Sequence, residues 1–243
     1  MTSQPTLFPT EKASRERVKL DAILDAPRYI VIEGVIGVGK TTLARLLATR
    51  YSARLVLEEF EENPFLERFY EDRDRWAFQT QLSFLASRFR QQQSLAGADL
   101  FHSHVVSDYS FDKDRIFAHL NLHGDELRLY ETLFGHMRQS TPAPDLVVYL
   151  QSSTDRLMRN IELRGRPYES TMDRAYIEAL NEAYNYFFFR YHQSPLLIVN
   201  AAHIDFVNNE DDLVQLVHQI STLTHPGTTY FSPPREAPVP PTD

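Results

Sequence analysis

The sequence contains no cysteine, few glycines and no long apolar run, and these absences exclude several classes of protein. Without cysteine, neither a disulfide bond nor a thiolate metal site can form. No stretch approaches the roughly 18 apolar residues of a membrane-spanning helix. The first residues also lack the basic and then apolar pattern of a signal peptide. We therefore expect a soluble cytoplasmic protein that does not bind a membrane.

Basic residues are fewer than acidic ones, 25 against 33, which gives a net charge of −8. A nucleic-acid-binding protein would normally show a basic surface, so nucleic acid is not an expected partner. The nine histidines are scattered without the spacing of metal ligands, which excludes an obvious histidine metal site. The 243 residues, of which 42% are hydrophobic, can bury one large core.

The two ends of the chain differ from the middle. Residues 1–26 are interpreted as an N-terminal extension. Residues 225–243 carry five prolines among the last eleven positions and show no periodicity, which is typical of a disordered tail. A single domain over residues 27–224 is expected between them.

Short apolar runs alternate with helical patterns along this domain. The runs are rich in β-branched residues and apolar on both faces, as buried parallel strands are; they lie at 29–33, 54–58, 104–108, 145–150 and 196–200. Helical patterns occupy 40–51, 74–95, 111–139, 154–163 and 173–192. This alternation predicts an α/β fold with a doubly wound parallel sheet, in which ligands bind at the carboxyl ends of the strands.

Three of the chain's eight glycines lie within six residues, directly after the first expected strand. The stretch fits G-x-x-x-x-G-K-[ST], the phosphate-binding P-loop, and a helical pattern follows it as that motif requires. Glycines let successive amide groups face an anion, Lys40 can reach the β- and γ-phosphates, and Thr41 can bind Mg²⁺. The sequence therefore predicts a site for ATP and Mg²⁺. Its expected residues are Gly34, Val35, Ile36, Gly37, Val38, Gly39, Lys40, Thr41 and Thr42.

Carboxylates follow the next two expected strands. Glu58 and Glu59 lie at the end of the second strand. A carboxylate there could accept the proton of an attacking hydroxyl. Alternatively, both residues belong only to a solvated acidic loop. Asp108 ends the third and is a candidate ligand of Mg²⁺; the structural alternative is that it caps the next helix.

Arginines gather around a glycine after residue 158. Arg164 and Arg166 suit a lid that closes over phosphates and neutralises charge during transfer. The same pattern would also fit a basic helix end that is only exposed to solvent. A lid favours transfer to a small acceptor, because such chemistry must exclude water.

At this point the chain resembles the deoxynucleoside kinase family, especially the bacterial deoxyguanosine and deoxyadenosine kinases. The resemblance covers about residues 28–220 and rests on GVIGVGKTTLA, EEFEENPF, FYEDRDRWAFQTQLSFLASRFR, SDYSFDKDRIFA and LRGRPYE, in that order. It implies a P-loop nucleoside-kinase-like three-layer fold with a parallel five-stranded sheet and an arginine-bearing lid. It also implies transfer of the ATP γ-phosphoryl group to the 5′-hydroxyl of a deoxynucleoside, and a homodimer.

The resemblance further implies roles for individual residues. Glu58 is the preferred general base, with Glu59 as a competitor. Tyr70 and Glu169 are expected to hold the sugar 3′-hydroxyl. Gln81, Arg88 and Asp114 are expected to read the base, and Trp76, Phe84 and Phe111 either sandwich it or fill the core.

Two departures from the family pattern stand out. Tyr109 follows Asp108 where an arginine near the transferring phosphate is usual, and Arg115 is a candidate substitute. Asn160 stands where the first arginine of the lid is expected, with Arg159 one residue away, about 100° around a helix.

Two other functions compete with this reading. A nucleoside monophosphate kinase would need extra basic residues for its charged acceptor, and a P-loop switch would need neither a base-reading helix nor a lid. The resemblance favours a purine, deoxyguanosine or deoxyadenosine, as the acceptor base, and deoxycytidine remains open.

Overall fold

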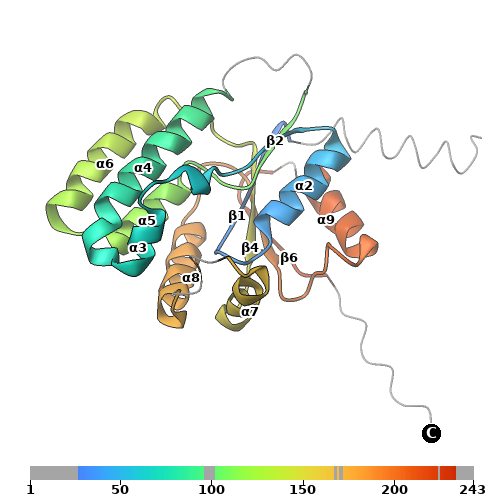
Figure 1. The fold of residues 1–243 in the computed structure, drawn as a ribbon. Helices are drawn as coiled ribbons and strands as arrows, with labels where there is room; N and C mark the ends of the chain where they lie inside the picture. Colours follow the sequence, from blue (N-terminus) through green and yellow to red (C-terminus); the bar gives the residue numbers. More distant parts are fainter. Residues whose placement is uncertain (1–26, 96–101, 167–168, 170–171, 224, 234–243) are drawn as a thin grey trace, which may run out of the picture.

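The computed structural model describes residues 27–95, 102–166, 169, 172–223 and 225–233, which form a parallel sheet flanked by helices (Figure 1). The strand order is β2-β3-β1-β4-β5-β6, and every neighbouring pair is parallel. The strands are β1 (Tyr29–Gly34), β2 (Arg54–Val56), β3 (Val105–Ser107), β4 (Leu146–Gln151), β5 (Leu196–Asn200) and β6 (Thr228–Phe231). The α/β fold class predicted from the sequence is confirmed.

Within the described ranges the sheet has six strands, and the predicted number of five is wrong. β6 lies inside the segment 225–243 that was expected to be a disordered tail, and it pairs with β5 from Leu196 opposite Thr228 to Val199 opposite Phe231. β6 is an edge strand whose first three residues are exposed, so it lacks the apolar run that marks the inner strands. The expected N-terminal extension, 1–26, and the tail from 234 onward lie outside the described residues.

Helices connect the strands. They are α2 (Lys40–Tyr51), α3 (Leu66–Glu71), α4 (Arg73–Gln93), α5 (Lys113–Asn121), α6 (Gly124–Arg138), α7 (Thr154–Arg164), α8 (Arg174–Phe189) and α9 (Glu210–Thr222), with a short 3₁₀ turn at Phe60–Glu62. Figure 1 draws α3 to α6 gathered on one side of the sheet and α2 and α9 on the other. None of the helices in the described ranges is both long and apolar enough to cross a bilayer.

The single helix expected over 111–139 is instead two helices, α5 and α6. Leu122 is fully buried and adopts an extended conformation, and Gly124 begins α6 with a φ of 55°. Burying Leu122 between the two helices requires the chain to turn there, and Gly124 accepts the left-handed conformation at little cost. The helices α3 and α9 were not anticipated from the sequence.

The centre of the sheet forms the core and places the site. β1 and β4 are buried over nearly their whole length. The P-loop follows β1, Glu58 follows β2, and Asp108 follows β3. Because the strands are parallel, these segments meet at one edge of the sheet.

Candidate active site

The glycine-rich loop after β1 leads directly into α2. Gly37 and Gly39 have φ values of 85° and 104°, which glycine adopts without strain. A Cβ atom on Gly37 would lie 2.8 Å from the carbonyl oxygen of Leu157, so α7 packs directly on the loop. The side chains of Val35 and Val38 are buried in the core, and only their main chain can face a ligand. A phosphate cradle needs such a bare, firmly packed main chain.

Lys40 and Thr41 stand at the start of α2. Lys40 Nζ donates to the carbonyl oxygen of Val35 at 3.1 Å, and Thr41 Oγ1 donates to Asp108 Oδ2 at 2.5 Å. Thr42 follows on the exposed side of the same turn. Together with Ile36, Lys40 and Thr41 line a cavity that the other strand-end residues also reach.

Asp108 joins this first turn to the segment after β2. Its Oδ1 atom accepts from the backbone N–H of Glu58 at 2.8 Å. Among the residues that the structure describes, no contact has Asp108 capping α5, whose N-cap is Asp112. The Thr41 hydroxyl and the Asp108 carboxylate are the oxygen donors that Mg²⁺ prefers, and they fit a Mg²⁺ ion that takes its other ligands from phosphate and water.

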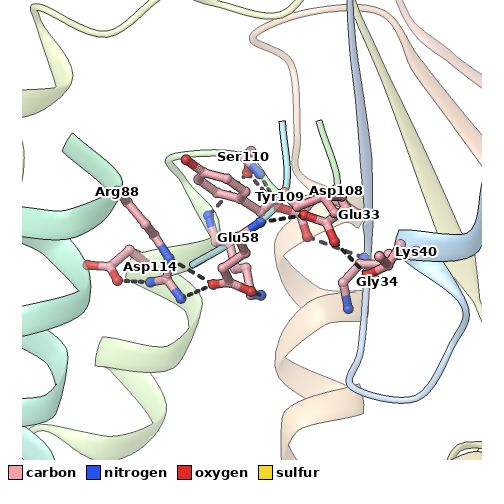
Figure 2. A network of polar contacts seen from close by, with 12 residues as sticks. Glu33, Gly34, Lys40, Glu58, Arg88, Asp108, Tyr109, Ser110 and Asp114 are labelled. Atoms are coloured by element: carbon pink, nitrogen blue, oxygen red, sulfur yellow. Dashed lines mark hydrogen bonds and ion pairs between the residues drawn. The ribbon is translucent and has the colours of Figure 1, made fainter. Parts of the chain in front are cut away.

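Glu58 lies at the centre of a network of charged side chains (Figure 2). Its Oε1 atom accepts from Arg88 at 3.0 Å (Nε) and 2.5 Å (Nη2), and its Oε2 atom accepts from Lys113. Arg88 also donates to Asp114. The other oxygen of Asp114 accepts from Tyr130 at 2.6 Å, so Asp114 fixes the guanidinium of Arg88.

The charge of Glu58 follows from these contacts. Burial alone would raise the pKa of its carboxyl group. The nearby charges of Lys113 and Arg88, and their hydrogen bonds, outweigh burial and hold this pKa well below its usual range. Glu58 is therefore an ionised carboxylate beside the P-loop.

Glu59 faces elsewhere. It is exposed, accepts from Gln91 Nε2 at 3.1 Å, and does not line the cavity, whereas Glu58 does. Of the two candidate bases, the geometry brings only Glu58 toward Lys40 and Thr41.

A second group of residues in the cavity could recognise a nucleoside. Gln81 and Arg88 are both buried and lie on the same face of α4. Gln81 Oε1 has no hydrogen-bond partner among the described residues, so a ligand could bind it. Tyr70 is half-buried and also lines the cavity.

The three aromatic candidates separate clearly. Phe84 lines the cavity, and the guanidinium of Arg88 lies 4.5 Å from the centre of its ring. Trp76 stacks on Phe65 away from the cavity, and Phe111 stacks on Phe134 in the core. Of the three, only Phe84 is placed to contact a base.

The last residue of α7, Arg164, and Arg166 just beyond it are the expected arginines of the lid. Arg164 donates to both oxygens of Glu169, at 3.1 and 2.5 Å. Arg166 lies 3.7 Å from the same carboxylate and stacks over Phe60, at 4.3 Å from its ring centre. Glu169 is buried, and all three charged side chains line the cavity.

The departures from the family pattern also have defined positions. Asn160 Nδ2 donates to the carbonyl oxygen of Gly37 at 2.7 Å, which ties α7 to the P-loop, whereas Arg159 is exposed. Tyr109 is fully buried and its hydroxyl donates to Gln91. Arg115 pairs with Glu131 at 2.9 Å, outside the cavity, so the structure does not place it as a substitute for the missing arginine.

Comparison with known proteins agrees with this arrangement. The family model described as "Deoxynucleoside kinase" matches residues 30–225. The chain belongs to the deoxynucleoside kinase family. This confirms the expected ATP-dependent phosphotransferase and decides against a nucleoside monophosphate kinase or a P-loop switch.

Two relatives of this deoxynucleoside kinase come from Bacillus subtilis. A deoxyadenosine/deoxycytidine kinase is 34% identical over 206 residues, which cover 81% of this chain and 93% of the relative. A deoxyguanosine kinase is 31% identical over 200 residues, which cover 80% and 97%. A solved deoxyadenosine kinase from M. mycoides shares the fold, with a TM-score of 0.71 and 24% identity over 79% of this chain and 98% of that one.

Two site residues of this deoxynucleoside kinase were missed from the sequence. Glu33, at the end of β1, is fully buried and accepts from the N–H and the hydroxyl of Ser110, both at 2.7 Å. Burial raises the pKa of Glu33. Lys113 contacts Glu58 directly. A signal existed for each: Glu33 is an acidic residue inside an apolar run, and Lys113 is a cation in the first turn of a helix, where the dipole disfavours positive charge.

Proposed function

We propose that this deoxynucleoside kinase phosphorylates the 5′-hydroxyl of purine deoxynucleosides, with Glu58 as the general base. The P-loop and Lys40 hold ATP, and Thr41 and Asp108 hold Mg²⁺. The observation that carries the proposal is the position of Glu58, which lines one cavity together with Lys40 and Thr41 on one side and Gln81 and Arg88 on the other. A nucleoside bound to the base-reading pair would therefore present its sugar to the carboxylate.

The remaining site residues would position the sugar and the phosphate. Tyr70 and Glu169 would hold the 3′-hydroxyl, since both line the cavity and Glu169 is a buried acceptor. Arg164 and Arg166 would neutralise the charge that develops on the transferred group. Their common contact with Glu169 would then link the sugar site to the phosphate site.

Two observations support a purine. A glutamine amide matches the donor and acceptor pair of adenine, and an arginine fork matches the two acceptors of guanine. Gln81 and Arg88 therefore suit the two purines better than one pyrimidine. The relatives named above act on deoxyadenosine, deoxycytidine and deoxyguanosine, which keeps deoxycytidine as a weaker acceptor.

An acceptor panel tests this function. ADP release is followed with ATP, Mg²⁺ and each of the four deoxynucleosides, the corresponding ribonucleosides and the deoxynucleoside monophosphates. We expect the highest kcat/KM with deoxyadenosine or deoxyguanosine, at least about 10-fold above deoxycytidine, because a site that hydrogen-bonds the base rejects acceptors that leave its polar groups unpaired. Turnover only with monophosphates, or turnover independent of any acceptor, would refute the proposal.

We also propose that the protein is a homodimer that associates through α5 and α8. These helices border an apolar groove lined by Ile116, Leu120, Ala183, Tyr186 and Phe187. Tyr186 is 64% exposed to solvent. A large aromatic side chain exposed beside an apolar groove is typical of a protein interface, where a partner covers it.

Sedimentation velocity tests the dimer. The wild type should sediment with twice the mass of one chain, and Tyr186→Glu should shift it toward the monomer because a charge is costly at an apolar interface. Leu163→Glu is the matched control, since Leu163 is exposed at the end of α7, away from the groove. A monomeric wild type, or equal effects of both changes, would refute this interface.

A further inference from the structure

Lysine is scarce in this chain and is concentrated at one place. Of the 25 lysine and arginine residues only four are lysines, at positions 12, 19, 40 and 113. The last two are the lysines of the described ranges, and both line the active-site cavity. Arginine carries the surface ion pairs, for example Arg115 with Glu131 and Arg174 with Asp155. A lysine differs from an arginine in being a compact charge with freely rotating donors.

Lys113 occupies a position that is unfavourable for a cation. It is the first residue of α5, where the helix dipole is positive, and it is only 5% exposed. A buried charge is costly unless it is paired, and its partner is Glu58 Oε2. Stability alone does not explain a lysine here, because an apolar side chain would avoid both costs.

Lys113 also acts on Lys40. Both ammonium groups reach the same cavity, and the positive charge of Lys113 acts on Lys40. Two cations that repel one another, Lys113 buried and Lys40 half-buried, are stabilised when an anion binds between them. Because Lys40 belongs to the P-loop, the anion that fits is the terminal phosphate of the nucleotide.

Several further groups face this pair and set the balance of charge. They are Glu33 on β1, Glu58 after β2 and Asp108 after β3, and Arg88 on α4 shares Glu58 with Lys113. Arg88 has Asp114 as a second partner and is held on the side of the base. Lys113 therefore remains as the cation that can serve both Glu58 and the phosphate.

We propose that Lys113 is a catalytic residue whose ammonium group pairs with Glu58 and turns to the transferred phosphoryl group during the reaction. This inference rests on the proposed function. In the step, the 5′-oxygen forms a bond to the γ-phosphorus and the bond to the β,γ-bridging oxygen breaks, so that its electron pair leaves on ADP. The hydroxyl proton passes to Glu58, while Lys113 stays protonated and donates to the phosphoryl oxygens. When Lys113 turns away, Glu58 loses one cation and becomes a stronger base.

The test compares Lys113→Met with Lys113→Arg, and Arg115→Met is the matched control on the same helix. We expect kcat of Lys113→Met to fall roughly 10²-fold, as for removal of one donor to developing charge, while the Kd of ATP changes much less. Lys113→Arg should recover part of the loss, because it restores the charge. Arg115→Met should retain the wild-type kcat, because its side chain lies outside the cavity.

Two further measurements separate a catalytic role from a structural one. ADP with aluminium fluoride and a deoxynucleoside mimics the transferred phosphoryl group, and Lys113→Met should bind this mixture far more weakly than the wild type. In addition, removing Lys113 takes away the strongest charge that lowers the pKa of Glu58, so this pKa should rise although Arg88 still lowers it. The loss of kcat/KM on acidification should therefore begin at a higher pH in Lys113→Met than in the wild type.

Specific outcomes would overturn the inference. Wild-type kcat in Lys113→Met would do so, and so would an equal loss of affinity for ATP and for the aluminium fluoride mixture. Thermal unfolding checks that the variant is folded, and Lys113→Gln takes its place if it is not. A wild type that phosphorylates no deoxynucleoside would instead refute the proposed function, so the two failures are distinguishable.

Discussion

Replacing Lys40 with alanine is expected to abolish turnover, with kcat/KM falling roughly 10³-fold or more, because the variant loses a fixed charge at the transferred phosphate. Lys40 is the lysine of the P-loop, and its ammonium lies against the carbonyl oxygen of Val35 inside the loop. The cavity beside it contains the carboxylates of Glu58 and Asp108, so loss of Lys40 removes a cation that offsets their repulsion of the phosphates. This kcat/KM is measured from ADP release over a range of ATP concentrations, with the deoxynucleoside at saturation.

The pKa of Lys40 gives a second, independent signature. Because burial and Lys113 lower this pKa to about 8, the free ammonium group loses its proton as the pH rises through about 8. A bound triphosphate favours the charged form, so ATP binding near this pH should take up protons and weaken as the pH rises. Calorimetry in buffers of different ionisation enthalpy measures this uptake, which should disappear in Lys40→Ala.

Arg45→Ala is the matched control for Lys40→Ala. Arg45 is a cation on the same helix, but it is exposed. It should retain the wild-type kcat/KM and proton uptake. Comparable losses in both variants, or turnover by Lys40→Ala within about 10-fold of the wild type, would contradict the assigned role.

The inner part of the fold could be predicted because burial leaves a direct mark on the sequence. β1, β4 and β5 lie inside the sheet, and each begins with at least four apolar residues in a row. β6 could not be found in this way, since this edge strand is mostly exposed and its short run of Thr, Tyr and Phe lies between two prolines, Pro226 and Pro233. The break between α5 and α6 depends on how Leu122 packs, which local periodicity does not reveal.

The same distinction holds for the site. The P-loop, Glu58, Asp108 and the arginines at 164 and 166 could be placed from motifs, because each follows a strand or ends a helix at a fixed spacing. Lys113 could not be placed in this way, since its proposed role depends on a contact with Glu58, which lies 55 residues away in the sequence. Arg115 was the candidate cation from the sequence, yet its side chain pairs with Glu131 instead. A side chain two positions further along a helix points in a different direction. Only packing decides which of the two side chains, Lys113 or Arg115, is buried.

Changing Glu58 to glutamine is expected to lower kcat about 10²–10⁴-fold, the usual cost of removing a well-placed base, while ATP still binds. The carboxylate is the one candidate base that lines the cavity, and its depressed pKa keeps it ionised at neutral pH. Glutamine keeps the size of the side chain and an oxygen that can accept from Lys113, and Arg88 retains Asp114 as a partner, so the variant should fold. Single-turnover phosphorylation of a deoxynucleoside and the Kd of ATP are the two measurements.

Glu59→Gln is the matched control, because it makes the same chemical change one residue away. Glu59 is exposed and bonded to Gln91, so its loss should leave kcat within about three-fold of the wild type, as is usual for surface substitutions. If Glu59→Gln were the crippling change and Glu58→Gln were active, the base would lie outside the cavity described above. In that case Glu58 would serve only to hold Arg88 and Lys113 together. Its removal should then lower the melting temperature while kcat stays near the wild-type value.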